Sequence, residues 1–175
     1  MSEWTEEELK DYIGLAESGD TDVQIYLGWA YASGTHVNKD EDLGRKWLQE
    51  AASRGSKEAA FRLAVFLTAK DDPESVAMLA KLSAEGFAPA AYELGNFYWV
   101  GFLVPRDTAA AEREWLLAAT NGHQLAKLKL LKCESLRSPL WKKPLLFAKM
   151  IWLGVTTAPL LSKNKSDPRV LGTLK

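Results

Sequence analysis

The chain has 175 residues, of which 47% are apolar and 26% charged, and this is typical of one soluble globular domain. Its net charge of -1 conceals an uneven distribution of charge along the chain. Residues 1–126 carry 11 Lys/Arg and 21 Asp/Glu, whereas residues 127–175 carry 11 Lys/Arg and 2 Asp/Glu. A single cysteine, Cys133, excludes an internal disulfide and favours a reducing compartment. The acidic first ten residues contain no secretory signal. These features predict a cytoplasmic protein.

A first helix is predicted over residues 5–18. Thr5 can cap backbone amides at its start, and Glu6, Glu7 and Glu8 favour the positive end of the helix dipole. The end of this helix, residues 15–19, matches residues 51–55 at a spacing of 36. We therefore expect it to be the second half of a truncated repeat that caps an array.

Two longer helical segments, residues 22–55 and 88–122, repeat one another at a spacing of 67. The matched pairs are Leu27/Leu94, Gly28/Gly95, Tyr31/Tyr98, Gly34/Gly101, Val37/Val104, Asp40/Asp107, Ala51/Ala118, Ala52/Ala119 and Gly55/Gly122. A shorter, degenerate copy occupies residues 57–86, and a partial fourth copy occupies residues 124–136. Each helix pair can bury only one side, so the pattern predicts a stacked solenoid without β-sheet.

Two glycines, Gly28 and Gly95, lie inside predicted helices. Glycine costs up to about 1 kcal/mol relative to alanine in a helix interior. We therefore expect these positions to let neighbouring helices cross closely.

The order of Ala, Leu-Gly, Tyr, Gly, Val, Asp, Ala, Trp, Ala-Ala and Gly in the two good copies resembles the Sel-like repeat (SLR) family, a branch of the tetratricopeptide-like α-solenoids. The resemblance covers residues 5–136 and is poor in the second copy. It implies an all-α, right-handed superhelix of antiparallel helix pairs. It also implies a scaffold for protein complexes without catalytic residues in its repeats.

An apolar, base-flanked helix is predicted over residues 137–162, followed by an irregular tail over residues 163–175. Residues 144–161 contain one charge, Lys149. They are too few for a membrane span, which needs about 20 apolar residues. Two ways of covering this apolar helix remain open. It can attach to an anionic membrane surface, or it can be covered by protein, either a partner or a second copy in a homodimer. The partial fourth repeat, which otherwise lacks a second helix, favours protein. The apolar surface expected on this segment comprises Trp141, Phe147, Met150, Ile151 and Trp152.

No catalytic, metal-binding or cofactor-binding residues are predicted. The two histidines, His36 and His123, lack the spacing of metal ligands, and no phosphate-binding loop is present. Cys133 and His123 could form a nucleophile and base, but no acid is placed to orient the histidine, which favours a structural role for the cysteine.

Several side chains on the first helices of the pairs occupy positions that the repeat leaves variable. These groove candidates are Trp29, Val65, Phe66, Tyr92, Phe97 and Trp99. Tyrosine and tryptophan are effective interface anchors, and the alternative that these side chains pack against the adjacent pair remains open.

The leading functional hypothesis is a non-catalytic scaffold or adaptor that holds a basic protein partner on an acidic solenoid surface. Alternatives are an immunity protein that covers a toxin effector and a membrane-peripheral adaptor tethered by residues 144–161. A hydrolase activity is implied only by some secreted relatives, and no nucleic-acid partner is predicted.

Overall fold

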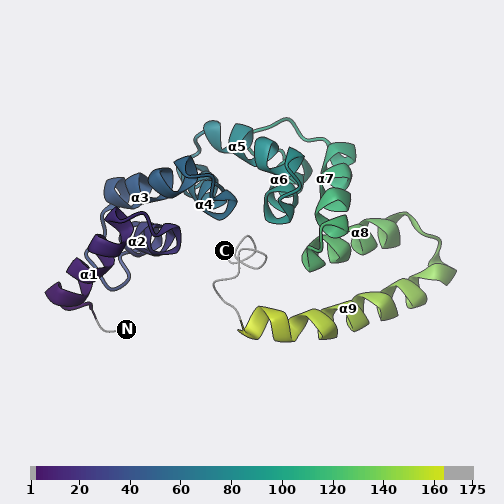
Figure 1. The fold of residues 1–175 in the computed structure, drawn as a ribbon. Coiled ribbons are helices and arrows are strands. Elements are labelled where there is room, and N and C mark those ends of the chain that lie inside the picture. The colour runs from purple at the N-terminus through teal and green to yellow at the C-terminus, as the bar shows by residue number, and fades with distance from the viewer. Residues whose placement is uncertain (1–2, 164–175) are drawn as a thin grey trace. The chain divides into compact units, whose positions relative to one another are not determined.

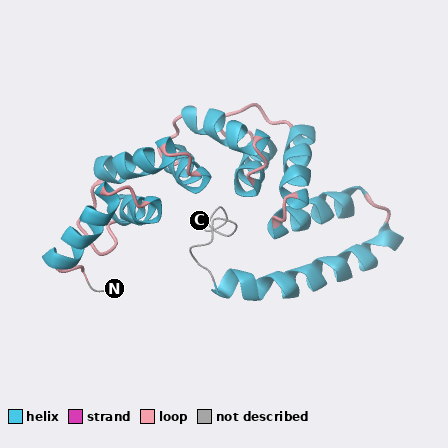
Figure 2. Ribbon diagram, in the orientation of Figure 1, coloured by secondary structure: helices cyan, strands magenta, loops and turns pink. Residues whose placement is uncertain are grey.

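The computed structural model describes residues 3–163 and consists, within that range, of α-helices, one short 3₁₀ helix and connecting loops (Figures 1 and 2). The all-α class predicted from the repeats is confirmed. The irregular tail expected over residues 163–175 lies, beyond Lys163, outside the described residues. The helices are α1 (Glu6–Glu17), α2 (Thr21–Ser33), α3 (Glu41–Ser53), α4 (Lys57–Thr68), α5 (Glu74–Ala84), α6 (Ala88–Val100), α7 (Thr108–Thr120), α8 (Gln124–Arg137), η1 (Leu140–Lys142) and α9 (Lys143–Lys163).

Local capping determines where most of these helices begin and end. Thr5 and Glu8 form a capping box at the start of α1. The carboxylates of Asp40 and Asp107 accept backbone N–H groups at the starts of α3 and α7. Gly34 and Gly101 end α2 and α6 in the left-handed conformation, with φ of 71° and 78°.

The chain divides into two compact units, which we call unit 1 (residues 1–75) and unit 2 (residues 76–175). Unit 1 contains α1 to α4 and the first residues of α5. Unit 2 contains the rest of α5 and α6 to α9. Each unit contains one of the two well-matched copies of the repeat.

In unit 1, α2 packs against α3, and α1 packs against α2. The α2–α3 crossing is close: a Cβ at Gly44 would lie 2.8 Å from both the Ala32 nitrogen and the Gly28 oxygen, and a Cβ at Gly28 would lie 2.7 Å from Leu48 Cγ. The close approach predicted at Gly28 is therefore confirmed, with Gly44 as its counterpart. Ala16 and Leu27 are fully buried in the adjoining core.

In unit 2, α6 packs against α7 in the same way. A Cβ at Gly95 would lie 2.6 Å from two atoms of the Trp115 ring, which confirms the close approach predicted there. Trp115 is 1% exposed and lies with Ala91, Tyr92 and Ala118 in the core of the unit.

The last long helix, α9, packs against α8. Leu146 and Leu153, two helical turns apart, are its buried side chains among those that the structure describes. The helix continues through Pro159 to Lys163.

Candidate protein-binding surfaces

Unit 1 carries a contiguous group of aromatic rings, which we call the N-terminal aromatic cluster: Trp4, Tyr12, Tyr26, Trp29 and His36. The Trp4 ring stacks on Tyr12 at 4.6 Å and on His36 at 5.2 Å between centroids. Tyr26 lies 5.4 Å from Trp4 and stacks on Trp29 at 5.9 Å. The rings come from the segment before α1, from α1, from α2 and from the loop after α2.

The backbone holds this cluster in place. The Trp4 N–H donates to the His36 carbonyl at 3.0 Å, which joins the N-terminal segment to the loop after α2. His36 adopts a left-handed φ of 68°, and Leu103, its counterpart 67 residues later, adopts 57°. Tyr12 and Tyr26 are half-buried, and Trp29 is 38% exposed. The cluster therefore presents aromatic surface to solvent.

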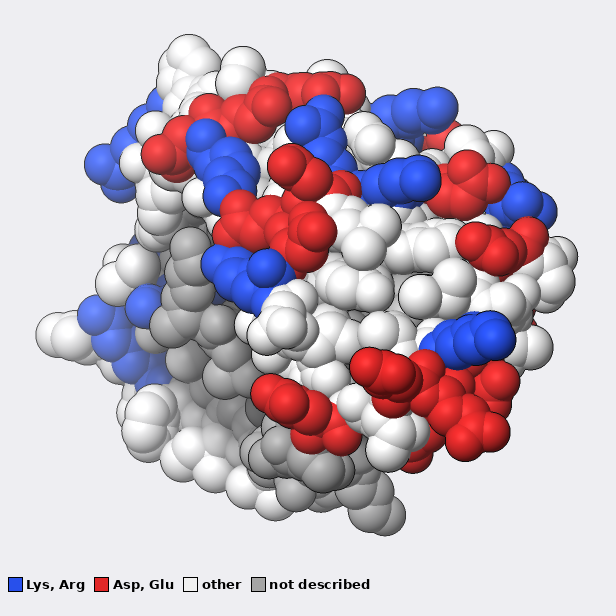
Figure 3. All heavy atoms as spheres, turned by 90° about the vertical axis from the view of Figure 1, so that its left-hand side faces the viewer, with Lys and Arg blue, Asp and Glu red and all other residues white. Residues whose placement is uncertain are grey.

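The surroundings of the cluster are acidic. Unit 1 contains 16 Asp/Glu against 8 Lys/Arg. Glu8 precedes Tyr12 by four residues and Asp22 precedes Tyr26 by four, a spacing that makes side chains neighbours on a helix surface. A hydrogen bond from the Thr5 backbone, followed by one from its hydroxyl, lowers the pKa of Glu8. Figure 3 shows acidic side chains gathered in groups on the side that it views, with basic side chains between them.

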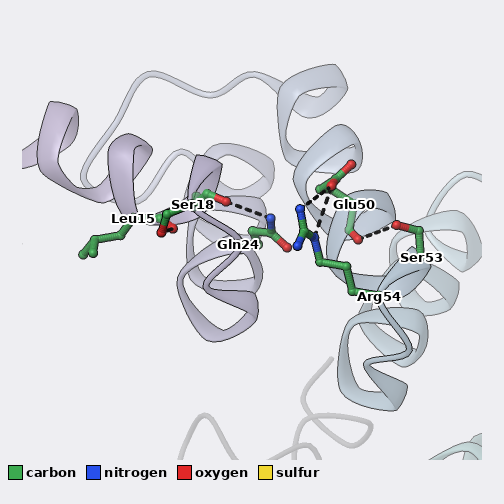
Figure 4. A network of polar contacts seen from close by, with 7 residues as sticks. Leu15, Ser18, Gln24, Glu50, Ser53 and Arg54 are labelled. Atoms are coloured by element: carbon green, nitrogen blue, oxygen red, sulfur yellow. Dashed lines mark hydrogen bonds and ion pairs between the residues drawn. The ribbon is translucent and has the colours of Figure 1, made fainter.

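Polar contacts hold α2 to the end of α1 and, separately, stabilise the last turn of α3 in the same unit (Figure 4). Buried Gln24 donates through Nε2 to the Ala16 carbonyl at 2.8 Å. Glu50 Oε1 accepts from Arg54 Nε at 3.2 Å and from Nη2 at 3.1 Å. A Cβ at Gly19 would lie 2.6 Å from Arg54 Nη1. These contacts are explained by helix packing and give no indication of a ligand.

Unit 2 contains a second group, which we call the α6–α8 polar cluster: Tyr92, Glu93, Asn96, His123 and Lys129. His123 is buried and stacks on Tyr92 at 4.3 Å between ring centroids. Lys129 Nζ lies 5.9 Å from the Tyr92 centroid and 5.3 Å from that of Trp115. Burial, the largest cause, lowers the pKa of Lys129.

Glu93 has the most perturbed environment in this group. Burial raises its pKa to about 7, against the lowering effects of a hydrogen bond from Asn96 and the charge of Lys129. Asn96 Nδ2 donates to Glu93 Oε2 at 3.4 Å. Glu93 Oε1 and Asn96 Oδ1 are buried without a hydrogen-bond partner.

The groove candidates separate into exposed and buried side chains. Trp29 and Val65 are 38% and 41% exposed. Phe66 is half-buried, with Lys70 Nζ 5.9 Å from its ring centroid. Tyr92 and Phe97, at 3% and 7% exposed, lie in the interior, and Trp99 packs on Trp115 at 5.4 Å.

Cys133 and His123 have structural surroundings. His123 Nδ1 accepts the Ala126 N–H at 3.3 Å and thereby caps α8. Cys133 is buried, and burial followed by the nearby charge of Glu112 raises the pKa of its thiol. A raised pKa disfavours the thiolate that a nucleophile requires. No group of three potential metal ligands occurs among residues 3–163.

The apolar C-terminal surface expected from the sequence is largely exposed. Trp141 is 76% exposed, Trp152 68%, Phe147 64% and Ile151 52%, whereas Met150 is half-buried. Within the described part of the chain, no helix is long and apolar enough to cross a bilayer.

Sequence reasoning missed most of the N-terminal aromatic cluster. Trp4, Tyr12 and Tyr26 are visible as aromatic residues near the start of the chain, but they come from three segments whose contacts depend on the fold. The α6–α8 polar cluster was missed for the same reason, since Lys129 follows Glu93 by 36 residues. That spacing, the period of the repeat, was the available signal.

The paired helices define an α-solenoid of the repeat-protein class. A model of the Sel1 repeat matches residues 21–56 and 88–123, the two segments in register at a spacing of 67. The chain is also similar to the crystal structure of a Sel1 repeat protein from Oxalobacter formigenes, with 30% identity, a TM-score of 0.58, and coverage of 71% of this chain and 98% of that one. This chain therefore belongs to the Sel1 repeat, or Sel-like repeat, family.

A second similar structure supports the fold. It is a protective antigen present in uropathogenic Escherichia coli strains that displays an SLR fold, with a TM-score of 0.66 and 21% identity. The match covers 93% of this chain and 39% of that one. Sel1 repeat proteins are generally scaffolds for protein–protein interaction.

Proposed function

We propose that this protein is a non-catalytic scaffold that holds a basic segment of a partner protein against the N-terminal aromatic cluster. The observation that carries the proposal is the group of stacked rings ending in exposed Trp29, within a unit that contains 16 acidic and 8 basic side chains. The lone, buried Cys133 supports a reducing, cytoplasmic location.

The chemistry of the cluster fits Lys and Arg side chains. The face of an indole or phenol ring attracts a cation, and the attraction is greatest for Trp. An acidic surface also accelerates encounter with a basic partner and disfavours acidic ones. Aromatic anchors can then contribute most of the binding energy. An adaptor and an inhibitor that covers a basic effector would use this same surface.

The test is to select Lys- and Arg-containing peptides from a displayed peptide library, with the full-length protein as the immobilised target. The affinities of the selected peptides are then measured by fluorescence anisotropy. Replacing Trp29 by alanine should weaken binding by about 1–3 kcal/mol, the range of interface anchors. The Trp152→Ala variant is the matched control, because Trp152 is an exposed tryptophan of unit 2. Equal affinity of the Trp29 variant and wild type, with both folded, would refute the proposed site.

A further inference from the structure

The side of α9 that faces away from α8 is apolar, and nothing in the described structure covers it. Leu146 and Leu153 mark the side that packs on α8. The exposed large apolar side chains of the helix are Leu145, Phe147, Ile151, Trp152 and Val155, at 63%, 64%, 52%, 68% and 66% exposure. Leu140 and Trp141, at 80% and 76%, extend this surface into η1. A helix on the surface of a soluble protein usually has the opposite pattern, with its polar side facing water.

The charges of the helix border this surface. Lys149 follows Leu146 by three residues and precedes Leu153 by four, so it lies beside the packed side. Lys143 precedes Leu146 by three and lies beside the packed side as well. Their long stems allow the ammonium groups to reach around the helix while the apolar side chains point outward.

The whole segment is positively charged. Residues 127–156 contain seven Lys/Arg and one acidic residue, Glu134. The surface that covers the outer side of α9 must therefore be apolar where it meets Phe147 and Trp152, and negatively charged around them. An anionic bilayer has both properties, because its acyl boundary accepts the apolar side chains and its phosphates surround them.

A second copy of the chain fits less well. Face-to-face packing of two α9 helices would bring two positively charged segments together. Unit 1 has the opposite charge, but its exposed large apolar side chains in the described range are Leu15, Trp29 and Val65, which lie on three different helices. In its N-terminal aromatic cluster only Trp29 is exposed rather than half-buried, so unit 1 offers a smaller apolar surface than α9 presents.

We propose that η1 and α9 dock in the plane of an anionic membrane surface, with Trp141, Phe147, Ile151, Trp152 and Val155 inserted at the headgroup boundary and Lys142, Lys143 and Lys149 among the lipid phosphates. Trp and Phe on the apolar side, with Lys at its borders, are the composition of interfacial helices. The α8 side of the helix remains packed on protein. This attachment is peripheral.

The experiment is flotation of the full-length protein with vesicles of phosphatidylcholine, with and without phosphatidylglycerol. We expect flotation only with the anionic vesicles, and its loss in high salt. The Phe147→Ala/Trp152→Ala double variant should bind at least about tenfold more weakly, because it removes two inserted aromatic rings. The Lys142→Gln/Lys143→Gln/Lys149→Gln variant should bind on the order of a hundredfold more weakly.

Two matched controls identify the segment responsible. Lys10→Gln/Lys46→Gln/Lys81→Gln removes the same charge from exposed lysines elsewhere, and Leu15→Ala/Val65→Ala removes exposed apolar side chains of unit 1. Both should float like wild type, with helicity checked for every variant by circular dichroism.

Three results would overturn the proposal. These are absence of flotation with anionic vesicles, equal weakening by the two lysine variants, or a dimer in sedimentation that the Phe147→Ala/Trp152→Ala variant dissociates. The last result would identify a second copy as the cover.

Discussion

The fold shifts the pKa values of two glutamates, Glu41 and Glu93, in opposite directions. Hydrogen bonds from Lys39 and then Lys70 lower the pKa of Glu41 to about 2, so this carboxylate is stabilised in its charged form. Glu93 has the opposite shift, to about 7, because burial is the largest effect and Lys129 compensates only in part. The cost of burying a charge therefore exceeds the benefit of its neighbours at Glu93.

The raised pKa of Glu93 predicts a pH-dependent stability. Between its ordinary pKa of 4.5 and its folded value of about 7, the folded chain binds more protons than the unfolded chain. The free energy of unfolding should therefore fall as pH rises through this interval and level off above it. Glu93→Gln should remove this dependence and be more stable than wild type by roughly 1–3 kcal/mol near pH 8.

Urea unfolding monitored by circular dichroism between about pH 5 and pH 8 would check this prediction. Glu134→Gln is the control, since it makes the same substitution at an exposed position. A wild-type stability that stays constant or rises across the interval would contradict the raised pKa of Glu93.

At the scale of helices, the features of the fold that depend only on residues adjacent in the sequence could be predicted from the sequence. Asp40 and Asp107 begin helices and Gly34 and Gly101 end them, and each pair recurs in the sequence at a spacing of 67, because capping involves only adjacent backbone groups. The two copies even share the backbone bond from Asp40 N to Tyr31 O and from Asp107 N to Tyr98 O, both 2.9 Å.

The candidate site was less predictable, since it depends on contacts between segments. Trp29 is exposed, whereas Tyr92 and Phe97, on the equivalent helix of the other copy, are buried. The periodicity places all three on first helices but does not determine which neighbours cover them. Trp4 escaped notice because it precedes the first repeat and joins it through His36.

Two glycine substitutions in unit 1, at Gly44 and Gly14, should have opposite effects, because only the first lies at the α2–α3 crossing. Gly44→Ala should lower the free energy of unfolding by about 1–3 kcal/mol, because the new methyl group would meet backbone atoms of Ala32 and Gly28 at 2.8 Å. Gly14→Ala, in α1, meets no atom within 4 Å and should raise stability by about 0.5–1 kcal/mol. Chemical denaturation of the two variants tests the pair. Stabilisation by both would mean that the helices can separate without cost.

At the scale of the whole chain, the two compact units differ in charge. Unit 1 has 8 Lys/Arg against 16 Asp/Glu, and unit 2 has 14 against 7. The near-neutral total therefore describes neither unit. This division places the proposed partner surface in the acidic unit and the proposed lipid surface in the basic one, so the two proposed contacts use separate parts of the chain.

The units also differ in the residues that form their cores, which predicts separable stability. The core cluster around Ala16, Leu27 and Tyr31 consists of residues of unit 1, and the cluster around Tyr92 and Trp115 consists of residues of unit 2. In repeat proteins, stability is a sum over repeats and their immediate neighbours, so a local defect need not spread along the chain.

Hydrogen exchange measured by mass spectrometry on the Gly44→Ala variant should therefore show faster exchange in α2 and α3. The amides of α6, α7 and α8 should exchange as in wild type. Gly95→Ala is the reciprocal variant, because its new methyl group would meet the Trp115 ring in unit 2. It should accelerate exchange in α6 and α7 and leave α2 and α3 unchanged. If either substitution accelerates exchange equally in both units, the chain unfolds as one cooperative body, and the stability of one unit cannot be adjusted without changing the other.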